Sequence, residues 1–110
     1  MNGNNYQELA LVTANKEMLA EEQSALLNGV LGLVGESGEI ADSIKKAFFQ
    51  GHSLDKDAIA KELGDVMWYV ALTAHAIGYE LDTVMEMNIA KLKARYPQGF
   101  EAHKSINRTE

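Results

Sequence analysis

Apolar residues recur every three to four positions along most of this chain, and that period constrains the fold more than any other feature. The spacing gathers them on one face of an α-helix, whereas a strand needs strict alternation. The single proline, Pro97, lies near the end of the chain, so no proline interrupts the helical pattern before residue 97. We expect four helices, over about 5–18, 21–50, 55–77 and 81–95, with Gly51 and Gly78 ending the middle two. The second may bend or break at its glycines. The sequence therefore predicts an all-α fold.

The composition is that of one acidic globular domain. The chain has 110 residues, 46% hydrophobic and 24% charged, and we expect a single domain over 1–110, with an acid-bearing core at about 25–100 and a loosely held polar tail at 101–110. The net charge of −6 argues against nucleic-acid binding, which needs clustered Lys and Arg. Without cysteine, thiolate metal sites are excluded. There is no signal-peptide pattern and no apolar run of the ~20 residues that span a bilayer, so we expect a cytoplasmic protein without a membrane partner.

Two of the expected helices each carry a pair of acids spaced three residues apart. The pairs are Glu36 and Glu39 in "GESGEIAD", and Glu62 and Asp65 in "KELGDVMWYV". At about 100° per residue, each pair borders the apolar stripe instead of facing open water. If the helices pack antiparallel, four carboxylates converge, and they repel one another unless a cation lies among them. Oxygen ligands suit Mg²⁺ or Mn²⁺, whereas a four-helix di-iron site would need Glu-x-x-His, which the chain lacks. The alternative is two solvated acidic faces.

Glycines accompany the first acid pair. Each glycine inside a helix costs ~1 kcal/mol relative to alanine. Four of them, Gly29, Gly32, Gly35 and Gly38, fall in the second expected helix, and the first two share the face of the acids. We predict that these glycines clear space beside the acids for a metal-bound ligand.

Three segments taken together resemble a known family. "GESGEIAD", "KELGDVMWYV" and "NIAKLKARYPQGF" are similar to the MazG-like nucleotide pyrophosphohydrolases of the all-α NTP pyrophosphatase superfamily, over about residues 25–100. The resemblance implies a four-helix bundle assembled as a homodimer or a dimer of dimers. It implies Mg²⁺, with Mn²⁺ as a substitute, on Glu36, Glu39, Glu62 and Asp65. Members hydrolyse a nucleoside triphosphate between the α and β phosphates, releasing the monophosphate and pyrophosphate.

The resemblance also implies where substrate binds. Asn88, Lys91 and Arg95 share a polar stripe of the last helix, where relatives commonly use Lys or Arg to hold phosphates. A basic last turn that complements the helix dipole is the alternative. Tyr69, one turn beyond the second acid pair, would bond a phosphate or carboxylate, or else fill the core. Asp42 matches a further acid of the family and is a peripheral candidate.

The expected reaction is metal-assisted hydrolysis, with the four acids as catalytic residues and Glu39 as the group that takes the proton of the attacking water. Two alternatives stay open: a related pyrophosphohydrolase acting on another nucleotide, such as phosphoribosyl-ATP or dUTP, and a non-catalytic helical dimer that binds Mg²⁺ or nucleotide. Trp68 lies off both the acid face and the apolar stripe and is expected at a subunit contact, and His52 is expected in a solvated loop.

Overall fold

The computed structural model describes residues 1–108, which form six α-helices and no strand. The helices are α1 (Gly3–Val12), α2 (Lys16–Leu19), α3 (Glu22–Phe49), α4 (Lys56–Ala76), α5 (Leu81–Arg95) and α6 (Ala102–Ile106). The prediction of an all-α fold is confirmed, and the last three expected helices coincide closely with α3, α4 and α5. None of the described helices is long and apolar enough to cross a membrane.

The first expected helix, over 5–18, is wrong, because the chain breaks there into α1 and α2. The Thr13 hydroxyl donates a hydrogen bond to the Ala10 carbonyl (2.6 Å) at the end of α1. Asn15 is extended (φ −66°, ψ 121°), and its side chain accepts a hydrogen bond from the Met18 N–H (3.1 Å). A side chain that caps the next turn in this way starts a new helix. The polar tail also contains a helix, α6, where only a loosely held segment was expected.

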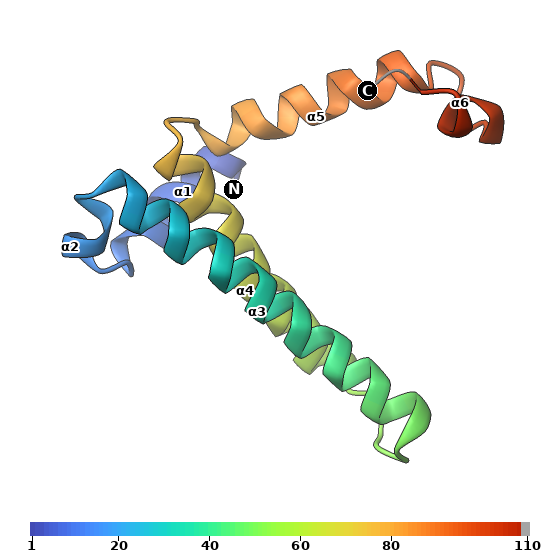
Figure 1. The fold of residues 1–110 in the computed structure, drawn as a ribbon, viewed down its shortest axis with the longest axis horizontal. Coiled ribbons are helices and arrows are strands. Elements are labelled where there is room, and N and C mark those ends of the chain that lie inside the picture. Colours follow the sequence, from blue (N-terminus) through green and yellow to red (C-terminus); the bar gives the residue numbers. More distant parts are fainter. Residues whose placement is uncertain (109–110) are drawn as a thin grey trace.

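The centre of the molecule is a hairpin of α3 and α4, which lie side by side along most of their length (Figure 1). The α3 helix runs through all four of its glycines without a break. Gly51, at φ +75°, ends it in the left-handed conformation that glycine adopts freely. Asp55 then begins α4 by accepting a hydrogen bond from the Ala58 N–H (3.1 Å). The short connection makes the two helices antiparallel.

Two glycines of α3 allow α4 to approach closely. A Cβ at Gly29 would collide with the Thr73 hydroxyl and would lie 3.3 Å from the Thr73 Cα. A Cβ at Gly32 would collide with the ring of Tyr69. The prediction that these two glycines keep space free beside the acids is therefore wrong, since side chains of α4 fill that space. Gly35 and Gly38 differ, because a Cβ there would meet nothing within 4 Å.

The α5 helix leaves the hairpin and projects away from it (Figure 1). Hydrogen bonds with α1 fix its first turn. The Asp82 N–H donates to Asn4 Oδ1 (2.9 Å), and the Asn4 N–H donates to Asp82 Oδ1 (3.3 Å). The Leu81 N–H donates to Gln7 Oε1 (3.1 Å). Beyond that turn every residue from 85 to 94 is exposed. One copy of the chain therefore does not close a four-helix bundle.

Candidate functional site

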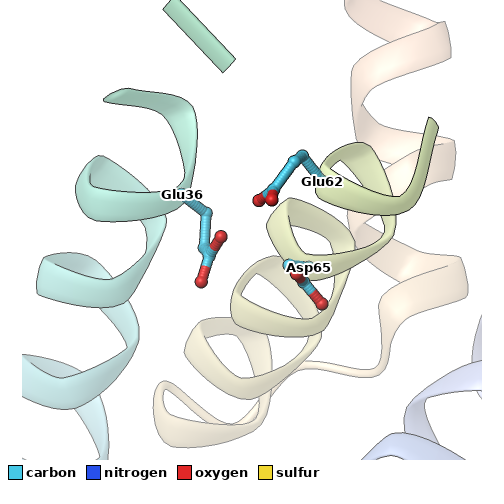
Figure 2. A group of neighbouring side chains, drawn as sticks. All are labelled: Glu36, Glu62 and Asp65. Atoms are coloured by element: carbon cyan, nitrogen blue, oxygen red, sulfur yellow. The ribbon is translucent and has the colours of Figure 1, made fainter. Parts of the chain in front are cut away.

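Carboxylates from α3 and α4 meet across the hairpin. Glu36, Glu62 and Asp65 each offer one oxygen, and these three oxygens lie within 4.8 Å of one another. Figure 2 shows Glu36 and Glu62 pointing toward each other across the gap between the helices, with Asp65 one turn along α4. We call these three residues the acid cluster. It forms because an antiparallel hairpin places the two acid pairs at the same level.

Two atoms of the acid cluster lack a partner. Oε2 of Glu36 and Oε2 of Glu62 are buried, and no hydrogen-bond donor reaches either of them. Buried charged oxygens are stable only when they are paired or coordinate a metal ion. Three carboxylates within one coordination distance, with no nitrogen or sulfur ligand among them, suit a hard divalent cation such as Mg²⁺. The residues therefore fit the metal ion that the sequence analysis expected.

The carboxylates of the two helices perturb one another. Interaction with the Glu36 side chain raises the pKa of Glu62, and desolvation and the nearby negative charges add to this effect. Glu39 is exposed and lies outside the acid cluster, yet repulsion by Glu62 raises its pKa as well. Neighbouring negative charges disfavour ionisation of each carboxyl group, and a nearby cation would favour it. The fourth predicted acid is thus close enough to sense the cluster without being part of its tightest group.

A cavity of about 260 Å³ opens beside the acid cluster and is lined by Glu36, Asp65, Trp68 and Tyr69. The two aromatic rings stand edge to face, with centroids 4.9 Å apart and planes at 78°. Tyr69 is held in place by Gly32, whose missing side chain leaves room for its ring. The predicted position of Tyr69, next to the acids, agrees with its place in the cavity wall.

Trp68 was expected at a subunit contact, but its polar edge is bound within its own chain. The indole N–H donates hydrogen bonds to Thr13 Oγ1 (2.8 Å) and to the Ala10 carbonyl (3.2 Å), both at the end of α1. Sequence reasoning missed this contact because it treated 5–18 as one helix. The Ala10 carbonyl and the Thr13 hydroxyl can accept these bonds because α1 stops at Val12 and does not continue through Thr13.

Asp42 and His52 lie apart from the acid cluster. Asp42 forms ion pairs with Lys46 (2.9 Å) and Lys45 (3.6 Å), and its hydrogen bond with Lys46 is the main reason that its pKa is lowered. His52 is exposed in the loop between α3 and α4, where it lines a smaller cavity of about 120 Å³ with Ser43 and Lys46. Asp42 is therefore a paired helix-surface acid, outside the group that could hold a cation.

The predicted phosphate-binding residues lie on α5. Asn88 and Lys91 are exposed, and Arg95 is half-buried at the end of the helix, 5.9 Å from the ring centroid of Tyr96. Because α5 projects away from the hairpin, the structure does not bring this stripe to the acid cluster of the same chain (Figure 1).

The chain is similar in sequence to one protein family and to a phage protein. A family model described as the MazG nucleotide pyrophosphohydrolase domain matches residues 21–100, which include the acid cluster, Glu39 and all of α5. The gene 37 protein of Mycobacterium phage L5 is similar to this chain, with 40% identity over 82 residues that make up 71% of this chain and 72% of that protein. No solved structure matches the chain.

Proposed function

This chain belongs to the MazG nucleotide pyrophosphohydrolase family, and we propose that it is a Mg²⁺-dependent enzyme that hydrolyses a nucleoside or deoxynucleoside triphosphate to the monophosphate and pyrophosphate. The observation that carries the proposal is the acid cluster, whose two buried, unpartnered oxygens call for a divalent cation. A triphosphate can bind at such a site in an acidic protein, because the cation would offset the negative charge of the triphosphate and of the carboxylates.

Glu36, Glu62 and Asp65 hold the cation in this proposal, with Glu39 completing the acid set. A divalent cation held there would neutralise phosphate charge and would lower the pKa of an attacking water. Glu39 takes the proton from that water, since it borders the cluster and keeps an exposed carboxylate. Tyr69 faces the same cavity and donates a hydrogen bond to a phosphate or to one of the carboxylates.

The phosphate chain is held by the basic end of α5 in this proposal. Lys91 and Arg95 bind the charge that develops on the leaving pyrophosphate, and Asn88 lies beside them on the same stripe. These three residues and Tyr69 form the substrate-binding set.

We also propose that the chain works as a homodimer or a dimer of dimers. Its accessible surface is 7903 Å², against roughly 6,000 Å² for a compact protein of this mass. Its radius of gyration is 17.0 Å, against about 13 Å for a compact domain of this length. The excess surface exceeds the ~800 Å² that each partner buries in a standard interface. Association would complete the four-helix core that one copy leaves open.

Residues 1–110 act as one domain, with the acid-bearing core at about 25–100. The net charge of −6 favours a small-molecule substrate over nucleic-acid partners. We place the protein in the cytoplasm, without a membrane partner.

The test is pyrophosphate release from a panel of nucleoside and deoxynucleoside triphosphates, with Mg²⁺ and with EDTA. Including phosphoribosyl-ATP and dUTP in the panel separates the related substrates. Glu36→Gln and Glu62→Gln should abolish release, whereas Asp57→Asn should retain it. Asp57 is a matched control, because it is an α4 acid that is exposed and paired with Lys61 (3.3 Å) away from the cluster. Pyrophosphate release from no member of the panel, or equal loss in all three variants, would refute the proposal.

A further inference from the structure

The N-terminal helix α1 reaches the candidate site although it precedes residues 21–100, which the family model matches. The Tyr6 hydroxyl donates a hydrogen bond to the Gly64 carbonyl (3.4 Å), beside the acid cluster. Burial raises the pKa of Tyr6, and the negative charge of nearby Asp65 adds to this effect. The end of α1 binds the indole of Trp68, about one turn further along α4. The α1 helix is therefore an addition to the matched domain that contacts its candidate site.

The indole of Trp68 is held at its polar edge by two acceptors. Its N–H donates to Thr13 Oγ1 (2.8 Å) and to the Ala10 carbonyl (3.2 Å). The Thr13 hydroxyl donates to the same carbonyl (2.6 Å), so the three polar groups are all bonded to one another. Only two side-chain torsions separate an indole ring from its backbone, and bonds at the far edge of the ring restrict both. These bonds therefore fix the plane of the Trp68 ring.

The ring that α1 fixes is part of the wall of the cavity beside the acid cluster. Two carboxylates and two aromatic rings line this cavity of about 260 Å³: Glu36, Asp65, Trp68 and Tyr69. Trp68 lies three residues, or ~4.5 Å along the helix axis, beyond Asp65. A nucleoside joined to a phosphate at the acid cluster would therefore meet the rings. An apolar ring whose only donor is already bonded suits a nucleoside and not a phosphate chain.

We propose that Thr13 is a positioning residue, which holds the indole of Trp68 as the cavity wall against which the nucleoside of the substrate packs. This inference rests on the proposed function for the identity of the ligand, and it adds a role for the end of α1. Thr13 touches no substrate and acts only through Trp68. Because the ring has no free donor and no acceptor, it recognises the shape of the nucleoside and not its hydrogen-bonding edge.

The first experiment follows the ring itself and does not depend on activity. Trp68 is the only tryptophan of the chain, so time-resolved anisotropy of tryptophan fluorescence reports on this ring alone. Thr13→Val keeps the shape of the side chain and removes its hydroxyl, whereas Thr13→Ser keeps the hydroxyl. We expect larger local motion of the ring in Thr13→Val and wild-type motion in Thr13→Ser. The control is Thr83→Val, at an exposed position of α5, which should leave the motion unchanged. Equal ring motion in wild type and Thr13→Val would overturn the proposal.

The second experiment measures steady-state hydrolysis of the best triphosphate with Mg²⁺. A wall that contacts the nucleoside equally before and during the reaction affects KM and not kcat. Thr13→Val should therefore raise KM by roughly two- to tenfold, the factor that corresponds to one ordinary hydrogen bond, with kcat near wild type. Thr13→Ser should restore KM. A lower kcat with an unchanged KM in Thr13→Val would indicate only a loss of folded enzyme and would overturn the proposal.

Trp68→Phe tests the same hydrogen bond from its other end, because it keeps an aromatic ring and removes the N–H. In this background Thr13→Val should raise KM no further, since the bond is already absent. Additive effects of the two substitutions on KM would show that Thr13 does not act through Trp68 and would overturn the proposal. A wild type that hydrolyses no triphosphate would refute the proposed function, and with it the ligand named here, whereas the anisotropy would still decide whether Thr13 positions Trp68.

Discussion

Replacing Gly29 by alanine should destabilise the protein, although alanine is the better helix former. The gain in helix propensity is ~1 kcal/mol. The new Cβ would collide with the Thr73 hydroxyl, and because the Thr73 Cα lies 3.3 Å away, the backbone of α4 must shift with it. Overpacking of this kind costs ~1–3 kcal/mol. Gly38→Ala is the matched control, because it lies in the same helix, has the same propensity gain and meets nothing within 4 Å.

The propensity gain cancels between the two variants, so their unfolding free energies should differ by about 1–3 kcal/mol. For a domain of this size, that corresponds to a difference in Tm of roughly 4–20 °C. Thermal unfolding at one protein concentration, with EDTA present, measures it. A Gly29→Ala variant as stable as Gly38→Ala would show that the glycine does not set the separation of α3 and α4. Since that separation positions the acid cluster, Gly29→Ala should also weaken Mg²⁺-induced stabilisation, which Gly38→Ala should leave intact.

Three further outcomes follow from the site. In EDTA, Glu62→Gln should melt at or above the wild-type temperature because one like charge is removed, and with excess Mg²⁺ the order should reverse; equal stabilisation of both proteins by Mg²⁺ would contradict a shared site. Folding raises the pKa of Glu39 and Glu62, so the metal-free folded protein binds these two protons more tightly than the unfolded chain does. The Tm of the metal-free protein should therefore fall as the pH rises from the ordinary glutamate pKa through the raised values. Glu62→Gln should flatten that dependence of Tm on pH. Lys91→Ala should lower kcat/KM for the best triphosphate with little change in Tm, whereas Lys93→Ala, on another side of α5, should leave both near wild type.

The helices were predictable where the local signals agreed. The sequence of α4 has a clear apolar period, an N-terminal cap at Asp55 and a glycine just after its C-terminal end. Its expected bounds are close to those observed. The first helix was not predictable, because the residues at 13–15 are compatible with a helix and the break depends on competing local bonds. Asn15 caps the following turn, and Thr13 bonds back to Ala10. Such bonds compete with helix continuation without changing the apolar pattern.

The acid cluster was predictable because it depends on two periodicities and one short loop. The three-residue spacing puts each pair on one helical face, and the loop forces the two helices to be antiparallel. The position of α5 was not predictable in this way. Its direction depends on the left-handed Gly78 (φ +83°) and on the buried side chain of Gln7, whose partners lie more than sixty residues away in the sequence. A helical wheel assigns residues to a face but does not show which neighbour that face will meet.

The glycines of α3 connect the stability of the hairpin with the formation of its cation site. Gly29 and Gly32 lie one to two turns before Glu36, and they let α4 approach until Thr73 and Tyr69 fill the space they leave. The same close approach brings the carboxylates of both helices within 4.8 Å, where they repel one another. At this separation of α3 and α4, side-chain packing stabilises the hairpin and repulsion between the carboxylates destabilises it. A cation that binds the carboxylates removes the opposition without changing the packing, so cation affinity and hairpin stability must rise and fall together.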